Sequence, residues 1–429
     1  MVRIYVEQVS ERLLYVLDFV LKDRGLEYSV TNDELSFLES GGARLNYSEY
    51  ALPGITHLRP ASVLFDEDIR QYRIEKATFQ GEECLSFDGV DDPLAAVFYV
   101  LSRYEEYIFS GTDEHDRFDM SQSVQVRFGW LEKVICDRWA ESFVHFLRAS
   151  SGFQLETVRL NLRVVPTFDI DNTYAHLLKE GPRRWGAVLK DYVKGDRERL
   201  AERKKVTAGI ERDPYDTYAL IEAIADSGFP VLIFWLLGDY RNFDRNVTFR
   251  DPRHQRLIRR MSNKCSIGIH PSYRSNENAF LLGTEKARLE EILGESVTCS
   301  RQHFLKLSLP STYQRLITAG IRNDYTMGMA DRIGFRAGTA RSFFWFDLAK
   351  NSSTALRIHP FAYMDGTLNE YLHLTPEVSK QKISELFNEV RQFGGNFTFI
   401  WHNETINDRG KWTGWKDVLE YTLKLQEDE

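Results

Sequence analysis

Polar side chains follow six apolar segments of this sequence, each at the point where the segment ends. The endings are Thr167-Phe168-Asp169-Ile170-Asp171-Asn172, Gly268-Ile269-His270-Pro271-Ser272-Tyr273, Ser300-Arg301-Gln302-His303-Phe304, Arg322-Asn323-Asp324-Tyr325, Arg357-Ile358-His359-Pro360 and Ile400-Trp401-His402-Asn403. Four of the six contain a histidine. One such ending is ordinary, but six in one chain indicate a shared site rather than polar groups paired within the core.

Carboxylates, imidazoles and an arginine together favour metal-dependent hydrolysis. A hydrolytic metal site needs histidine and carboxylate ligands and a position open for water. The bound water becomes acidic enough to attack near neutral pH, and a neighbouring carboxylate accepts its proton. An imidazole across the site can protonate the leaving group, and an arginine can hold a carboxylate in place. The sequence has a candidate for each of these parts.

The elements that must position these residues alternate between strand and helix from about Val158 onward. Seven apolar runs are predicted strands: Leu160–Phe168, Val231–Leu237, Ser266–His270, Val297–Ser300, Ile321–Tyr325, Ala355–His359 and Phe397–Trp401. Helices are predicted at Tyr215–Ser227, Glu285–Gly294, Ser379–Gln392 and Gly414–Leu425. This alternation favours a mostly parallel sheet, whose carboxyl ends share one rim. We therefore expect an α/β fold for residues 156–429, a distorted (β/α) barrel of about seven parallel strands.

Residues 1–155 are predicted to form a smaller α+β domain that precedes the barrel. Ser10 can cap a helix, and further segments are predicted as helices at Asp92–Tyr107 and Cys136–Ala149 and as a short strand at Ser62–Phe65. His115 and Asp116 lie in a polar stretch that is predicted to be a surface loop. No catalytic group is expected in this domain.

The overall charge and the N-terminal segment restrict the class of protein. The formal net charge of -8 argues against a nucleic-acid binder, which needs a basic surface. A local basic stretch, Arg197 to Lys205, is typical of a solvated helix face. Asp18 interrupts the N-terminal apolar run, and no run reaches the roughly 20 residues that a membrane helix needs. We expect a cytoplasmic protein without a membrane span.

The segment Thr167-Phe168-Asp169-Ile170-Asp171 resembles the first motif of the polysaccharide deacetylases, the NodB-homology group of carbohydrate esterase family 4. The resemblance implies that Asp169 is the catalytic base and that Asp171 binds the metal. The family's second motif, His-Ser/Thr-x-x-His, is matched at His270, a metal ligand by the same resemblance. Its second histidine is replaced here by Arg274. The similarity covers about residues 160–405.

Two further motifs of the family have counterparts in this chain. Arg301-Gln302-His303-Phe304 is similar to Arg-x-Pro-Tyr/Phe, with histidine in the proline position. We expect His303 to supply the missing third ligand and Arg301 to orient Asp169. Phe399-Ile400-Trp401-His402 is similar to the last motif, which implies that His402 is the general acid.

Three residues are predicted to contact the substrate. Asp324 corresponds loosely to the fourth motif, and Tyr273 and Trp401 stand beside motif histidines, where their rings can stack on a sugar. His359, before Pro360 at a strand end, suits a structural role and a site role equally well.

The resemblance implies removal of an acetyl group from an amino sugar or polysaccharide precursor. The deviating motifs and the N-terminal domain are similar to a divergent branch associated with bacterial surface-polysaccharide synthesis. The expected cofactor is a divalent metal, with Zn²⁺ placed first and Co²⁺ or Ni²⁺ as alternatives. The expected partner is a carbohydrate substrate.

Two other functions stay open at this point. Asp169-Ile170-Asp171-Asn172-Thr173 also resembles the Asp-x-Asp-x-Thr signature of haloacid dehalogenases, which makes Asp169 a phosphoryl acceptor in an Mg²⁺-dependent phosphatase, with Asp244 as a late acidic group. That function leaves His270, His303 and His402 idle, and Mg²⁺ prefers oxygen ligands. The missing second motif histidine also fits an inactive carbohydrate-binding or scaffold protein.

Overall fold

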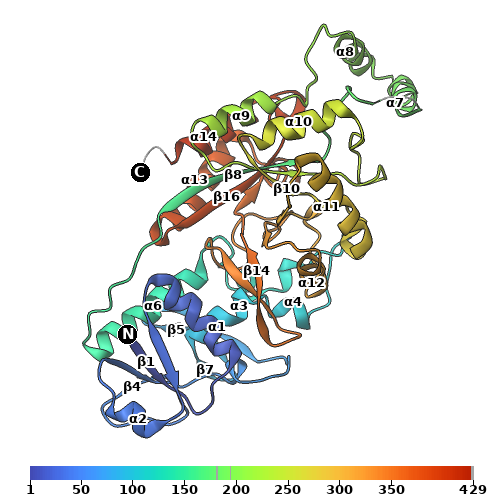
Figure 1. Ribbon diagram of the computed structural model, residues 1–429. Coiled ribbons are helices and arrows are strands. Elements are labelled where there is room, and N and C mark those ends of the chain that lie inside the picture. The colour runs from blue at the N-terminus through green and yellow to red at the C-terminus, as the bar shows by residue number, and fades with distance from the viewer. Residues whose placement is uncertain (180–181, 194, 427–429) are drawn as a thin grey trace.

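A computed structural model describes residues 1–179, 182–193 and 195–426 of the chain (Figure 1). The N-terminal third, in blue and cyan, contains two small sheets and several helices. The remainder is built around one large sheet. The structure is therefore mixed α/β.

The N-terminal third contains a four-stranded parallel sheet and a three-stranded antiparallel one. The first has the order β2-β1-β3-β4, with β1 at Val2–Tyr5, β2 at Tyr28–Thr31, β3 at Ala43–Asn46 and β4 at Thr56–His57. The second joins β5 (Ile74–Phe79), β6 (Glu82–Phe87) and β7 (Val90–Asp91). The helices are α1 (Glu11–Val20), α2 (Glu34–Glu39), α3 (Pro93–Leu101), α4 (Glu105–Ile108), α5 (Val124–Arg127) and α6 (Ile135–Ser151).

Local sequence signals account for some of these elements but not for all. Ser10 accepts a hydrogen bond from the Leu13 backbone N–H and begins α1, as predicted. The helix predicted at Asp92–Tyr107 is instead two helices, because the chain turns through a left-handed conformation at Arg103 (φ 57°). The strand predicted at Ser62–Phe65 is wrong, since Ser62–Leu64 forms a 3₁₀ turn.

The large sheet has nine strands in the order β13-β14-β12-β11-β10-β9-β8-β16-β15. The strands are β8 (Leu162–Ile170), β9 (Leu232–Trp235), β10 (Ser266–Ile269), β11 (Cys299–Ser300), β12 (Asn323–Asp324), β13 (Phe343–Asp347), β14 (Ser352–Ile358), β15 (Tyr363–Met364) and β16 (Gly395–His402). All neighbours are parallel except β13 and β14. The seven predicted strands are confirmed, whereas β13 and β15 were not foreseen. The pairings between described residues form an open row, so they do not show the expected barrel closure.

Helices connect the strands, as a parallel sheet requires. They are α7 (Pro182–Val193), α8 (Arg197–Thr207), α9 (Tyr218–Asp226), α10 (Pro252–Ser262), α11 (Ala279–Leu293), α12 (Ser311–Thr318), α13 (Pro376–Phe393) and α14 (Trp415–Lys424). Short 3₁₀ or π turns lie at Lys22–Arg24, Met120–Gln122, Ser275–Glu277, His303–Leu305, Thr367–Tyr371 and Gly410–Trp412. The four helices predicted in this region correspond to α9, α11, α13 and α14.

The strand register determines which side chains can meet. In the pair of β8 with β16, Asp169 lies beside His402, and in the pair of β10 with β11, Ile269 lies beside Ser300. The residues that follow these strands therefore leave the sheet at the same rim, as parallel packing demands.

The N-terminal third and the large sheet share one continuous hydrophobic core. Buried charges also link the two parts. Glu106 lies between Arg103 and Arg336, with oxygen-to-nitrogen distances of 2.8 Å and 2.6 Å, and all three side chains are at most 3% exposed. Asp137 pairs in the same way with Arg341 at 2.8 Å. The predicted boundary at residue 155 therefore separates segments that pack together.

We predict that Glu106→Ala lowers the free energy of unfolding by about 3–5 kcal/mol, because it leaves two buried guanidinium groups without their carboxylate. Glu114→Ala is the matched control: its side chain is 86% exposed, so the expected change is within about 0.5 kcal/mol. Urea unfolding followed by circular dichroism measures both. Equal stability of the two variants would contradict the prediction.

Candidate metal centre and active site

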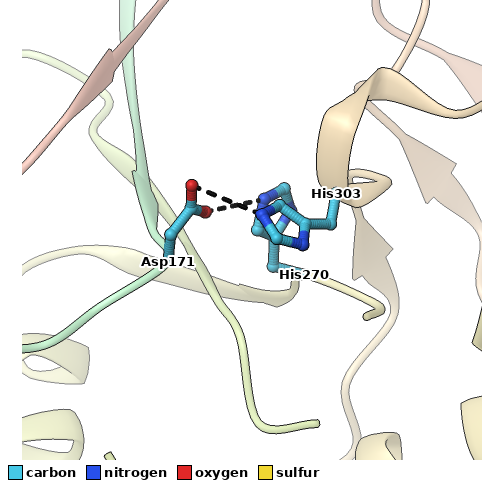
Figure 2. Close-up of side chains that lie close together, drawn as sticks. All are labelled: Asp171, His270 and His303. Carbon is cyan, nitrogen blue, oxygen red and sulfur yellow. Dashed lines mark ion pairs between the residues drawn. The ribbon is translucent and has the colours of Figure 1, made fainter. Parts of the chain in front are cut away.

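Asp171, His270 and His303 form a compact cluster at the rim of the sheet (Figure 2). One ligand atom from each lies within 4.8 Å of the other two. His270 Nε2 is 3.1 Å from Asp171 Oδ1, and His303 Nε2 is 3.4 Å from Asp171 Oδ2. The structure therefore brings the three expected metal ligands together.

Each of the three residues follows a different strand. Asp171 comes directly after β8, His270 directly after β10, and His303 three residues after β11. Arg274, at the position of the missing second motif histidine, is exposed to solvent. His303 thus lies where an imidazole is needed, and Arg274 does not approach the cluster.

Both imidazoles are oriented by a hydrogen bond from the ring nitrogen that faces away from Asp171. His270 Nδ1 lies 2.6 Å from the carbonyl oxygen of Arg301, and His303 Nδ1 lies 2.9 Å from Asp244 Oδ1. A donated Nδ1–H leaves the Nε2 lone pair free for a metal ion. Asp244 is only 2% exposed and was not expected in this role. No local motif indicates it, because it lies in the long connection after β9.

The electrostatics of the cluster favour a bound cation. Burial opposes ionisation of Asp171, but the charge of His303 and the close approach of the His270 and His303 rings outweigh burial and hold its pKa well below the ordinary value. Burial lowers the pKa of His303, yet Asp171 and Asp244 outweigh it and raise that pKa to about 9. Asp171 Oδ1 is buried and accepts no hydrogen bond. Two imidazoles and a carboxylate with a free oxygen suit Zn²⁺.

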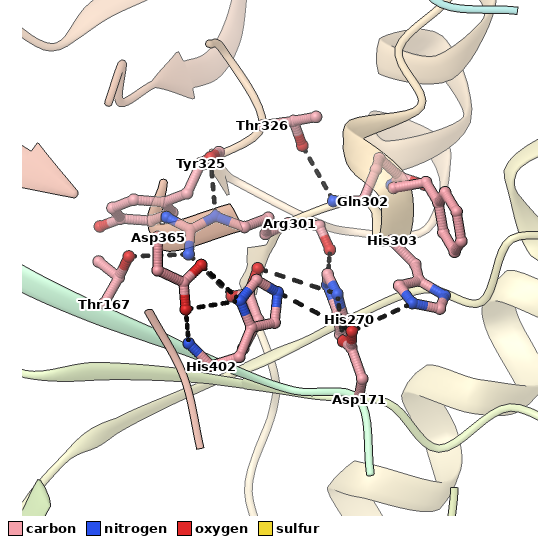
Figure 3. Close-up of polar contacts among 12 residues, drawn as sticks. Thr167, Asp171, His270, Arg301, Gln302, His303, Tyr325, Thr326, Asp365 and His402 are labelled. Atoms are coloured by element: carbon pink, nitrogen blue, oxygen red, sulfur yellow. Dashed lines mark hydrogen bonds and ion pairs between the residues drawn. The ribbon is translucent and has the colours of Figure 1, made fainter. Parts of the chain in front are cut away.

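A second carboxylate lies beside the cluster without joining it, and Arg301, whose contacts with Thr167 and Tyr325 are seen in Figure 3, binds it. Asp169 is 2% exposed, and its Oδ2 is 3.9 Å from His270 Nε2. Arg301 donates from Nη1 to Asp169 Oδ1 and to Thr167 Oγ1, both at 2.8 Å, and from Nε to the Tyr325 carbonyl at 3.0 Å. The expected orientation of Asp169 by Arg301 agrees with this geometry.

His402 also faces the cluster, with Nε2 3.8 Å from Asp171 Oδ2. Its Nδ1 lies 2.9 Å from Asp365 Oδ1, and its backbone N–H donates to Asp365 Oδ2 at 2.8 Å. Burial lowers the pKa of His402, but Asp365, Asp171 and Asp169 outweigh it and raise that pKa well above the ordinary value. Asp365 is fully buried. It was not predicted as a site residue, because it follows β15, a strand that the sequence did not indicate.

The structure does not support two of the expected substrate contacts. Trp401 is fully buried within the core, because it alternates with His402 along β16 and faces the other way. Asp324 is also fully buried and accepts hydrogen bonds from Ser300 and Thr326. Thr326 in turn accepts one from the backbone N–H of Gln302, so Asp324 holds the chain beside His303 in place.

Two other predicted residues lie close to the cavity without lining it. Tyr273 is half-buried and packs against the rings of Phe243, Phe304 and His115. His359 stacks on Tyr325 and hydrogen-bonds with neighbouring side chains, and burial lowers its pKa to about 4. The structure therefore gives His359 a structural role.

A cavity of about 390 Å³ opens over the cluster. Its lining residues include Asp169, Asp171, His270, His303, Phe304, Tyr371, His402, Glu404, Lys411 and Trp412. Arg117, from the N-terminal third, also lines it and donates to the Phe304 carbonyl at 3.1 Å. The stretch around His115 and Asp116 is thus more than a surface loop, because it packs beside the site: Lys306 pairs with Asp116 at 3.0 Å.

Comparisons with known proteins give the following matches. A family model described as a family of unknown function (DUF7033) matches residues 2–151. No curated protein matches the chain.

The similar solved structures include two described as polysaccharide deacetylases and one described as a deacetylase domain. One from Mycobacterium smegmatis is 15% identical with a TM-score of 0.41, over 63% of this chain and 86% of that one. One from Bacillus cereus is 10% identical with a TM-score of 0.31, over 63% and 89%. The BpsB deacetylase domain from Bordetella bronchiseptica is 10% identical with a TM-score of 0.26, over 56% and 97%. These TM-scores are below 0.5, so function has to be inferred from the side chains of the site.

We predict that the chain binds one Zn²⁺ and that Asp244→Asn weakens binding about 10- to 100-fold, because the His303 ring loses the carboxylate that orients it. His303→Ala removes a ligand and should weaken binding further. His373→Ala, at an exposed histidine, is the control and should bind normally. Calorimetric titration of metal-free protein measures the three affinities. Normal binding by His303→Ala would show that its imidazole is not a ligand.

Proposed function

We propose that this protein is a metal-dependent hydrolase that removes an acetyl group from an amino sugar or polysaccharide precursor. One observation carries the proposal: Asp171, His270 and His303 converge on one point, and the Asp169 carboxylate and the His402 imidazole both lie next to this cluster. Metal ligands, base and acid are thus distinct groups around one cavity.

A metal ion held by Asp171, His270 and His303 would polarise the acyl carbonyl and acidify a water molecule. Asp169 is the proposed base. It stands next to the ligand cluster, and Arg301 keeps it in one orientation through a buried 2.8 Å hydrogen bond. Because Arg301 also bonds Thr167 and the Tyr325 carbonyl, the carboxylate has little freedom to turn toward the metal position.

His402 is the proposed acid that protonates the departing amine. Asp365 accepts from its Nδ1, which leaves Nε2 directed toward Asp171 and the cavity. The raised pKa of His402 keeps the imidazole protonated before the bond breaks. Base and acid therefore reach the metal position from two neighbouring strands, β8 and β16.

The proposed substrate is a carbohydrate, and the proposed metal is Zn²⁺, with Co²⁺ or Ni²⁺ as alternatives. Support comes from the motifs around Asp169, His270 and His402, which resemble those of polysaccharide deacetylases, and from a cavity with both polar and aromatic walls. A role in bacterial surface-polysaccharide synthesis follows from the same resemblance.

The phosphatase alternative fits the structure less well. It requires Asp244 as a free carboxylate for Mg²⁺, whereas Asp244 is buried against His303 and the backbone N–H of Tyr273. It also leaves Asp171 beside the imidazoles of His270 and His303, which suit a softer cation than Mg²⁺. Arg301 orients Asp169 and Asp365 orients His402, as a catalytic base and acid require. This arrangement favours an active enzyme over a scaffold protein.

We predict that Asp169→Asn abolishes acetate release while the protein keeps its metal, because the amide cannot accept a proton and Asp171, His270 and His303 remain in place. N-acetylglucosamine oligosaccharides and O-acetylated sugars serve as substrates for the Zn²⁺-loaded protein, and metal content is measured by atomic absorption. If metal is lost instead, the roles of Asp169 and Asp171 are reversed. Absence of acetate release from every acetylated sugar by the unaltered protein would refute the function.

We predict that Asp365→Asn shifts the alkaline limb of the kcat–pH profile to lower pH. The acid must be protonated, so activity falls as pH rises through the pKa of His402. Loss of the Asp365 charge lowers that pKa, which moves the fall to lower pH. Asp331→Asn, at a carboxylate that is 54% exposed, is the control and should leave the profile in place. An unchanged profile in Asp365→Asn would exclude His402 as the acid.

A further inference from the structure

Helix α7 turns an apolar face toward solvent. Trp185, Leu189, Tyr192 and Val193 follow one another at spacings of four, three and one residues, which places them on one side of the helix. Their exposed fractions are 75%, 63%, 74% and 76%. Four large apolar side chains exposed together on one helix face are typical of a surface that another body covers.

The opposite side of α7 carries the buried charge. Asp191 is 5% exposed and accepts two hydrogen bonds from Arg203 of α8, at 2.6 Å and 3.2 Å. The helix therefore packs through an ion pair and leaves its apolar face outside, the reverse of an ordinary amphipathic helix on a core. Figure 1 shows α7 and α8 projecting together from the rest of the chain.

Helix α8, which contacts the opposite side of α7 through Arg203, adds positive charge to the projecting pair of helices. It contains five basic residues and two acidic ones, in a chain whose formal net charge is -8. Arg197, Lys204 and Lys205 of α8 are exposed, and Lys205 pairs with Glu211 at 2.7 Å. A projecting helix pair with an exposed apolar face and an excess of basic residues is complementary to an anionic lipid surface.

We propose that α7 and α8 dock this protein onto an anionic membrane surface. Tryptophan and tyrosine suit the boundary between headgroups and acyl chains, Leu189 and Val193 supply apolar area, and the α8 cations attract acidic headgroups. A second copy of the chain is a poorer occupant, because it brings one positive patch against another. No helix among the described residues is long and apolar enough to cross a bilayer, so the contact is superficial. This inference is independent of the proposed hydrolysis.

The docking helices are connected to the rim of the cavity. Glu202 of α8 pairs with His176 at 2.6 Å and with Arg409 at 3.2 Å. Arg409 lies between Asn407 and Lys411, which line the cavity.

Sedimentation of the full chain with vesicles tests the proposal. Vesicles of phosphatidylcholine with about 30% phosphatidylglycerol should pull down the protein, and pure phosphatidylcholine much less, because the charge term is missing. The triple variant W185S/L189S/Y192S should lose binding about tenfold or more, since the apolar contact is removed. Phe280→Ser, which removes an 80% exposed ring on α11, is the matched control and should bind normally.

Two further readouts separate the alternatives. Acetate release from a dispersed oligosaccharide should be equal in the triple variant and the unaltered chain, because none of the three residues lines the cavity. Equal sedimentation of the triple variant, or no sedimentation of the unaltered chain, would overturn membrane docking. Light scattering gives the oligomeric state of both proteins. If the unaltered chain is a dimer and the triple variant is a monomer, the apolar face binds a second copy, and membrane docking is overturned.

Discussion

The half-buried carboxylate of Asp171, whose Oδ1 is shielded from solvent, is the group on which the rest of the site depends. Three imidazole nitrogens lie within 4 Å of its oxygens, at 3.1, 3.4 and 3.8 Å. A buried negative charge is costly unless positive charge or hydrogen bonds compensate it. Here compensation comes from groups that are themselves held by further acceptors: Arg301 O for His270, Asp244 for His303 and Asp365 for His402. The outer partners thus determine which ring nitrogen each imidazole presents.

The two aspartates at the end of β8 differ in role because their surroundings differ. Asp169 faces a guanidinium that is itself locked by Thr167 and Tyr325, whereas Asp171 faces imidazoles and keeps one oxygen without a donor. A carboxylate already paired with arginine is a poor metal ligand but a well-oriented proton acceptor. Because a single residue separates Asp169 from Asp171 at the end of β8, one carboxylate can contact Arg301 while the other contacts the histidines.

The N-terminal third takes part in both stability and site architecture. Its buried Arg103–Glu106–Arg336 ion pairs join it to the chain that follows β12, and its Arg117 reaches the cavity wall at Phe304. Phe304 has a left-handed backbone (φ 59°) directly after His303, so this hydrogen bond supports a conformation that side chains rarely adopt. The α7–α8 pair has the opposite character, since it packs through charge and exposes its apolar face.

The sequence by itself determined the seven central strands and the convergence of their polar endings, because apolar periodicity and parallel topology are local signals with one geometric consequence. It also indicated Asp169, Asp171, His270, His303, Arg301 and His402, since motif residues lie at strand ends. Only the tertiary structure decided which residues orient these groups. Asp244 and Asp365 lie in connections without a recognisable motif, and they orient His303 and His402 only because the fold brings them into contact. Burial of Asp324 was equally beyond the sequence, because it depends on contact with Ser300 and Thr326, whereas Trp401 faces the core because it alternates with His402 along β16.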